Sequence, residues 1–124
     1  MSATAAKPAV KRPSYPVVDY EIIAETPDLR MIAITLGPGQ EVPWHWHTNI
    51  SDTFFCMQGP MTIETRAPRE VFELNPGETC VVPAKRAHRV TGKNDDPCKF
   101  GILQGVGTYD FNPIGTTAAD VKKA

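Results

Sequence analysis

The sequence predicts an all-β protein, a single domain whose short antiparallel strands form a sandwich or a barrel. Twelve prolines and nine glycines recur along its 124 residues and cut the apolar segments into lengths that suit strands better than helices. Most of these segments are rich in Val, Ile, Thr, Phe and Tyr, which favour strands. Between the two ends, no segment has the 3.6-residue apolar period of an amphipathic helix.

The expected strands follow one another with turn residues between them. They cover residues 17–25, 30–37, 53–59, 61–67, 70–75, 79–84, 88–92 and 98–105. The intervening segment 43–47, "PWHWH", is expected to be extended as well. Pro, Gly, Asn or Asp bounds most of these segments, and such residues end strands by fixing or freeing the backbone dihedral angles.

The two ends of the chain differ from the middle. Residues 1–16 are mostly Ala, Ser, Pro and Lys and are expected to form a flexible N-terminal arm. The β domain is expected over 17–106, followed by a C-terminal segment and tail over 107–124. Within that segment, Tyr109 and Phe111 are expected to cover one end of the barrel or a neighbouring subunit. Residues 116–124 fit either a short helix or a frayed tail.

Charge and cysteine content limit the classes of function. The net charge of −1 and the pI near 6.3 predict no nucleic-acid or anionic-membrane surface. No apolar run approaches the roughly 20 residues of a membrane span, and the first residues lack the apolar centre of a secretory signal. We therefore expect a cytoplasmic protein. Its three cysteines are odd in number and lack CxxC spacing, which predicts free thiols.

The three histidines are the main candidates for chemistry. His45 and His47 are two residues apart, so on a strand both project from one face while Trp44 and Trp46 project from the other. Two imidazoles placed in this way can share a metal ion. The bend "TNIS" can return a carboxylate, that of Asp52, toward the same point. The remaining histidine lies on a distant strand, which a barrel can bring across the cavity.

The spacing around the first histidine pair resembles the first sequence motif of the cupin superfamily. Gly39 is followed after five residues by His45 and His47. Four residues separate His47 from Asp52, and six more precede Gly59. All of these spacings match the motif. The one departure is an aspartate where the family usually has glutamate.

The region of the third histidine resembles the second cupin motif. Five residues separate Gly77 from Pro83, and His88 follows at the expected distance. Lys85 replaces the glycine of the motif, and Gly92 replaces its final asparagine. The resemblance implies a single-domain cupin-like antiparallel β-barrel, also called a double-stranded β-helix or jelly roll. It also implies a metal site inside that barrel.

The resemblance implies His45, His47 and His88 as metal ligands, with Asp52 as a fourth candidate. Because aspartate is one methylene shorter than glutamate, three roles stay open for Asp52. It binds the metal directly, binds through water, or accepts a hydrogen bond from a ligating imidazole. In the last two cases it is also a candidate catalytic base. Imidazole ligands suit divalent Fe, Mn, Zn, Ni or Cu, whereas Ca and Mg prefer oxygen ligands.

Several further side chains have expected positions. The tryptophans are expected to pack between sheets or at a subunit contact, and Cys56 is expected to be a plain core thiol. Gln104 and Arg89 are candidates for facing the cavity, although a solvated position is favoured for both. The apolar wall is expected to contain Phe54, Val82, Val90, Phe100 and Ile102.

Two functions follow from these observations. The first is a metal-dependent enzyme acting on a small organic molecule, either dioxygenase-like or like the sugar and carbonyl isomerases and lyases of the superfamily. The second is a non-catalytic cupin module that binds or senses a small ligand. A homodimer is expected, with the aromatic segment around Tyr15 and Tyr20 and the tryptophans as the contact surface.

Overall fold

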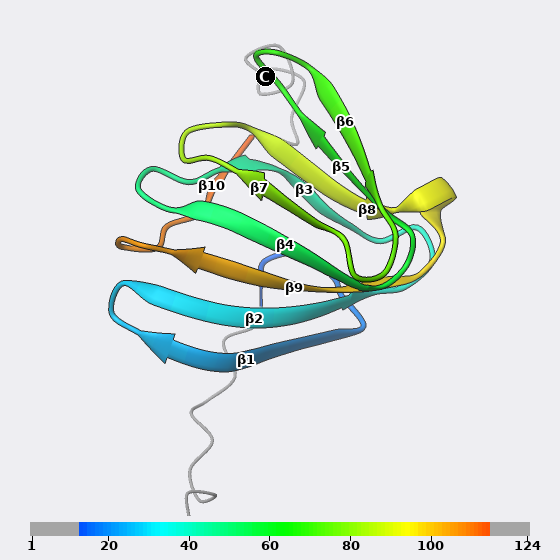
Figure 1. The fold of residues 1–124 in the computed structure, drawn as a ribbon, viewed down its shortest axis with the longest axis horizontal. Coiled ribbons are helices and arrows are strands. Elements are labelled where there is room, and N and C mark those ends of the chain that lie inside the picture. The colour runs from blue at the N-terminus through cyan, green and yellow to red at the C-terminus, as the bar shows by residue number, and fades with distance from the viewer. Residues whose placement is uncertain (1–12, 115–124) are drawn as a thin grey trace, which may run out of the picture.

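Ten strands, each ending at a turn, build the fold in a computed structural model that describes residues 13–114. Figure 1 shows them in chain order. Their bounds are β1 Asp19–Thr26, β2 Leu29–Leu36, β3 Glu41–Trp46, β4 Ser51–Gln58, β5 Met61–Thr65, β6 Glu70–Leu74, β7 Thr79–Val82, β8 His88–Gly92, β9 Cys98–Gly105 and β10 Asn112–Pro113. A short 3₁₀ turn, η1 Lys93–Asp95, precedes β9.

The strands form two antiparallel five-stranded sheets. One has the order β1-β2-β9-β4-β7 and the other β10-β3-β8-β5-β6 (Figure 1). Neighbours in each sheet are often distant in sequence, as a jelly roll requires. This confirms the predicted all-β, cupin-like antiparallel barrel. No helix within residues 13–114 is long and apolar enough to cross a membrane.

Alternating side chains along the strands build the core. In β5, Met61, Ile63 and Thr65 are buried, whereas Thr62 and Glu64 between them are only half-buried. This is the period of two that places successive side chains on opposite faces of a sheet. The five residues predicted for the apolar wall are all buried in one cluster. That cluster contains Tyr20, Ile32, Ile34, Leu36, Val42, Phe54, Cys56, Met61, Ile63, Leu74, Val82, Val90, Cys98, Phe100 and Ile102.

The predicted strand positions agree closely with the observed ones. The segments expected at 88–92 and 98–105 are β8 and β9 without change, and the others differ by at most two residues at either end. The strand around the histidine pair begins earlier than expected and ends at Trp46. Strand β10 and the turn η1 were not predicted. The tail expected at 116–124 lies outside the described residues.

The turn before β8 keeps a glycine-like backbone without a glycine. Lys85, at the position where the cupin motif has glycine, has a φ of 69°. This left-handed conformation is disfavoured for residues with a Cβ. The turn is held by the Lys85 amide, which donates a hydrogen bond of 2.7 Å to the carbonyl of His47. The same hydrogen bond connects the two segments that carry the histidines.

The three cysteines are free thiols, as predicted. Cys56 and Cys98 are buried and Cys80 is half-buried. Burial raises the pKa of the Cys98 thiol to about 12, because the thiolate would lose its hydration. Burial likewise raises the pKa of Cys56. These thiols stay neutral at physiological pH, which agrees with the plain core role expected for Cys56.

Candidate metal centre

The antiparallel pairing of β3 with β8 brings the distant histidine to the histidine pair. His45 lies directly opposite His88 in this pairing, and His47 follows the end of β3. Asp52, near the start of β4, approaches from the other sheet. One ligand atom of each of these four residues lies within 4.8 Å of the others. All four side chains are buried, with exposed fractions between 1% and 3%.

Each imidazole is oriented by a backbone carbonyl. Nδ1 of His45 lies 2.7 Å from the backbone carbonyl oxygen of Pro43. Nδ1 of His47 lies 2.6 Å from that of Asp110, and Nδ1 of His88 lies 2.9 Å from that of Arg86. Because a carbonyl oxygen only accepts, all three Nδ1 atoms carry the proton. The three Nε2 atoms are therefore the ones available for an ion.

The Asp52 carboxylate lies between two of these Nε2 atoms. Its Oδ2 is 3.0 Å from Nε2 of His47 and 2.9 Å from Nε2 of His88. Burial alone would raise the pKa of the Asp52 carboxyl, but the hydrogen bonds with the two imidazoles outweigh burial and hold it well below its usual value. Asp52 is therefore an anion inside the protein.

The same contacts set the charge of the imidazoles. Burial lowers the pKa of His45 to about 3, and the neighbouring His88 contributes to the shift. His47 also loses solvation, but its hydrogen bond with Asp52 and the negative charge there raise its pKa. His47 is thus a better candidate than His45 to carry a proton beside Asp52 when no cation is bound.

The donor set fits a divalent transition metal. Three imidazoles and one carboxylate are ligands that Zn, Fe, Mn, Ni and Cu accept. An ion at about 2.1 Å from each ligand holds neighbouring ligand atoms about 3.0–3.4 Å apart. The separations of Asp52 Oδ2 from the two Nε2 atoms are 2.9 and 3.0 Å. These separations are also those of ordinary hydrogen bonds, so the three roles that the sequence left open for Asp52 stay predictions.

A row of polar side chains crosses the first sheet and ends at Asp52. Gln104 on β9 pairs with Arg30 on β2 and with Asp52 on β4. Its amide nitrogen donates to Asp52 Oδ1 at 3.1 Å, and its oxygen accepts from Nε of Arg30. Gln104 is only 4% exposed, so the solvated position favoured for it by the sequence analysis was wrong.

Arg30 was not predicted as a site residue. It is 8% exposed and points inward like Ile32 and Ile34, which follow it at a spacing of two. The available signal was that Arg30 shares one face of the strand expected at 30–37 with these two isoleucines. Arg30 is the charged residue on that face. Arg89, by contrast, lies on the outer side, where it pairs with Glu41 and Glu64.

Aromatic side chains cover the histidines, as predicted for the C-terminal segment. The ring of Phe111 stacks on His45, with centroids 4.5 Å apart and planes at 18°. Tyr109 lies 5.4 Å from His47. Tyr15, at the end of the expected flexible arm, packs 5.9 Å from Phe111 and against the core. Tyr15, within the expected arm, thus packs onto the β domain; residues 1–12 of that arm lie outside the described range.

The tryptophans lie away from the metal centre, as expected. Both are half-buried, and the guanidinium of Arg66 stands 3.9 Å above the ring of Trp44. Tyr20, in contrast, is 7% exposed and points into the protein. The Tyr20 side chain therefore does not form part of an outer contact surface; the contact expected for the rest of this segment stays a prediction.

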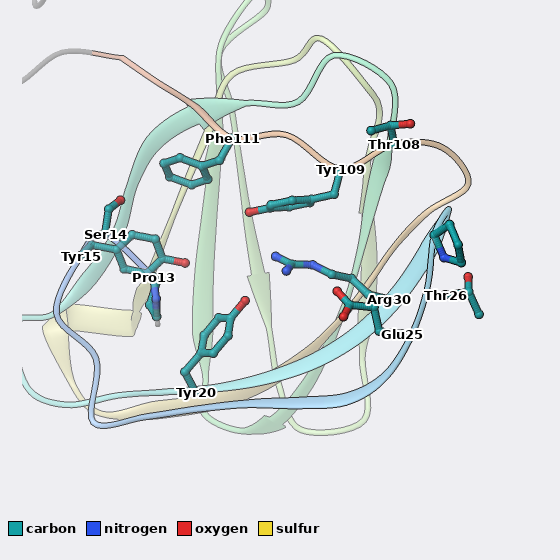
Figure 2. Close-up of a pocket in the computed structure, with 11 residues that line it drawn as sticks. Pro13, Ser14, Tyr15, Tyr20, Glu25, Thr26, Arg30, Thr108, Tyr109 and Phe111 are labelled. Atoms are coloured by element: carbon teal, nitrogen blue, oxygen red, sulfur yellow. The ribbon is translucent and has the colours of Figure 1, made fainter. Parts of the chain in front are cut away.

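A cavity of about 730 Å³ opens beside the histidine cluster. Figure 2 shows Tyr15, Tyr20, Tyr109 and Arg30 converging on its centre, with Phe111 above Tyr15. Arg30 also lines a much smaller inner cavity together with His45, His47 and Asp52. His45, His47 and Asp52 line only the small inner cavity, of about 10 Å³, whereas Tyr15, Arg30, Tyr109 and Phe111 line both cavities.

Comparisons with known proteins agree with this geometry. The family model of the cupin domain, Cupin_2, matches residues 33–108. No curated protein matches the chain. A conserved protein from Klebsiella pneumoniae with a double-stranded β-helix domain superposes with a TM-score of 0.67 at 23% identity, covering 81% of this chain and 86% of its own.

Two further solved structures illustrate the range of the fold. A cupin-2 domain protein from Shewanella frigidimarina has a TM-score of 0.60 and 26% identity, over 73% of this chain and 82% of its own. Oxalate decarboxylase from Bacillus subtilis has a TM-score of 0.63 and 21% identity, over 70% of this chain. This chain covers only 24% of the decarboxylase, so that likeness is one of fold alone.

Proposed function

This chain belongs to the Cupin_2 family of cupin domains, and on that premise we propose that it is a metal-dependent enzyme acting on a small organic molecule. The observation that carries the proposal is the orientation of the three imidazoles. Backbone carbonyls fix the proton on each Nδ1, so that the three Nε2 atoms are available beside one buried carboxylate. Metal-ligating histidines typically donate their other ring N–H to a backbone carbonyl in this way.

In this proposal His45, His47, His88 and Asp52 hold one divalent ion, with Fe, Mn, Zn, Ni and Cu as the candidates. The ion would supply Lewis acidity or, for a redox metal, electron transfer. Other residues of the protein shield and orient the site. Phe111 and Tyr109 exclude water from the ring edges, and Gln104 holds the Asp52 carboxylate in place.

The reaction class is proposed as dioxygenase-like or as isomerase- or lyase-like chemistry on a sugar or carbonyl compound. The fold supports catalysis on small molecules, since a protein of this fold is named oxalate decarboxylase. A fold alone does not establish a reaction. One observation favours the second candidate, a non-catalytic binding module. Both oxygens of Asp52 are already engaged by neighbouring side chains, so the cluster offers no free general base.

Element analysis of untagged protein tests the metal site. We expect about one equivalent of a transition metal in the wild-type chain and its loss in His47→Ala. Asp96→Asn, a change at an exposed carboxylate, serves as the control and should keep the metal. Equal metal content in wild type and His47→Ala would overturn the proposed site.

A second measurement tests whether the protein is an enzyme. The protein, reconstituted with each candidate metal, is incubated with panels of diketones, thiols and sugar acids while oxygen uptake and products are followed. Turnover that is lost in His47→Ala supports the enzyme. A compound that raises the melting temperature and is recovered unchanged, with no turnover in any panel, supports the binding module instead.

We also propose a homodimer, as the resemblance to small cupins implies, with the exposed apolar side chains as candidates for its contact surface. Among the described residues these are Val18, Ile23, Leu29, Met57, Val71, Val81 and Val106. Light scattering after size exclusion tests the assembly. A mass of about 27 kDa, twice the 13.6 kDa of the chain, is expected, and a 13.6 kDa peak would exclude the dimer.

A further inference from the structure

Arg30 is a buried cation without a buried counter-charge beside it. It is 8% exposed, and none of the ion pairs among residues 13–114 includes it. The carboxylate in its row, Asp52, is separated from it by Gln104 and is engaged by two imidazoles. A buried guanidinium is costly unless an anion or several hydrogen bonds compensate it. Glu25 lines the same cavity but is solvent-exposed and makes no ion pair with Arg30.

Arg30 contacts Gln104, Tyr109 and the hydroxyl of Tyr20, and its terminal nitrogens face the cavity (Figure 2). Its Nε donates to Gln104, and its guanidinium carbon lies 3.6 Å from the centre of the Tyr109 ring. One edge and one face of the guanidinium are therefore occupied. Figure 2 shows the free end of the guanidinium pointing into the space between Tyr15, Tyr20 and Tyr109. The N–H groups at this free end of the guanidinium lie in one plane, and their spacing suits the two oxygens of a carboxylate.

The walls around this cation are aromatic and carry neutral hydroxyls. Burial raises the pKa of Tyr109 to about 12, although the nearby Arg30 lowers it. Burial also raises the pKa of Tyr20, and Arg30 again acts in the opposite direction. At neutral pH these phenols are protonated and can donate to an anion. Their rings offer flat apolar surface to the rest of the ligand.

We propose that Arg30 binds the carboxylate of a small organic acid, whose apolar or ring portion packs between Tyr15, Tyr20 and Tyr109. The inference rests on the proposed function, since it names the class of substrate for the same site. Arg30 lines both the large cavity and the small inner cavity at the histidine cluster. An acid anchored there points its remaining atoms either toward the cluster or toward the opening. A cation bound at the cluster would add to the attraction for the acid.

Binding of matched acids and amides tests the assignment. Benzoate and phenylacetate are compared with benzamide and phenylacetamide by calorimetry and thermal shift on the full chain, both metal-free and loaded with Zn²⁺. We expect the acids to bind and the amides to bind at least tenfold more weakly. This comparison uses the unaltered protein and does not depend on the folding of any variant.

Variants of Arg30 identify the residue responsible. Arg30→Gln should weaken benzoate binding at least tenfold, and Arg30→Lys, which keeps the charge but not the planar N–H groups, should lie between Arg30→Gln and wild type. Arg69→Gln, at a side chain that is 74% exposed, is the matched control and should bind like wild type. Absence of binding by both acids, equal binding of acids and amides, or unchanged binding in a folded Arg30→Gln would each overturn the proposal. Inorganic phosphate binding as tightly as the acids would overturn the assignment to a carboxylate.

The test of acid binding at Arg30 and the test of the metal enzyme can give different results. Metal content is measured on the same samples. Stoichiometric metal with no acid binding removes the Arg30 site and leaves the metal enzyme. Acid binding in a protein that holds no metal leaves the Arg30 site and removes the metal enzyme.

Discussion

The guanidinium of Arg30 and the carboxylate of Asp52 lie on different strands and are joined by a single amide, that of Gln104. The amide can serve both only in one orientation, with its oxygen toward Arg30 and its nitrogen toward Asp52. The proposed ligand anchor and the proposed metal centre are therefore coupled through one side chain. The pairing of β2, β9 and β4 keeps the three residues in one row.

Replacing this amide tests the coupling. Gln104→Leu keeps the side-chain volume approximately but leaves Asp52 Oδ1 and the Nε of Arg30 without their partner. Loss of such an orienting contact typically lowers metal affinity 10–100-fold, and an unsatisfied buried polar group costs about 1–3 kcal/mol of stability. Zn²⁺ titration and urea unfolding measure the two effects. Gln58→Leu, at an exposed position on β4, is the control. Wild-type metal affinity in Gln104→Leu would show that Asp52 is positioned without the amide.

Removing the ring that covers His45 tests what shields the metal centre. Phe111→Ala deletes the stacked ring and admits water to the imidazole edge. The four ligating groups remain, so metal stoichiometry should stay the same, while the rate of metal removal by a chelator should increase several-fold. The rate is followed after mixing the Zn²⁺-loaded protein with EDTA and a colorimetric zinc dye. Phe72→Ala, a partly buried phenylalanine of β6 outside the site, is the control. An unchanged rate in Phe111→Ala would mean that ions leave by another route.

Metal binding should release protons, and His47 should be their main source. Its pKa is raised by Asp52, whereas the pKa of His45 is held at about 3, so His45 is already neutral at physiological pH. As pH falls, His47 gains a proton that competes with the ion, and affinity should fall by about tenfold per pH unit for each proton displaced. Calorimetry of Zn²⁺ binding in two buffers of different ionisation enthalpy counts the protons. Affinity that is independent of pH between 6 and 8 would contradict this assignment.

The sequence was sufficient to predict the four residues of the cluster. The fixed spacing of the two motifs and the two-residue period of a strand determine which side chains share a face. Both are local properties of the chain. The prediction that His88 reaches the pair depended on the resemblance, because the register between β3 and β8 is a long-range property. That register, with His45 opposite His88, agrees with the resemblance.

The sequence was insufficient for the residues around the cluster. Gln104 and Arg30 become neighbours only because β2 and β9 pair in one register, which no local pattern specifies. Tyr20 was expected at an outer contact, and yet it faces the cavity because the parity of β1 places it there. A shift of one residue in register moves every side chain of a strand to the other face of the sheet, so the sequence alone does not determine which face Tyr20 occupies. Lys85 likewise takes a glycine-like conformation that its identity would not predict.

Asp110 attaches the C-terminal segment to the bend before β4. The Asp110 carboxylate accepts hydrogen bonds from the amide and the hydroxyl of Thr48, and its backbone carbonyl accepts one from His47. The bonds from Thr48 hold the pKa of the Asp110 carboxyl below its usual value. A lowered pKa in the folded state means that Asp110 contributes stability above the unfolded-state value near pH 4. That contribution is lost as pH falls through the folded-state pKa.

Asp110→Asn should therefore lower the free energy of unfolding at pH 7 by about 1 kcal/mol, since the charged acceptor is removed. The difference from wild type should shrink as pH is lowered below 4, because the wild-type carboxyl is protonated first in the unfolded chain and then, at its lowered pKa, in the folded chain. Urea unfolding at pH 7 and pH 3 measures both, with Asp96→Asn at an exposed carboxylate as the control. The His47 contact uses the backbone carbonyl of residue 110, which the substitution keeps. Metal stoichiometry should consequently be unaffected, and its loss would indicate that the carboxylate itself positions His47.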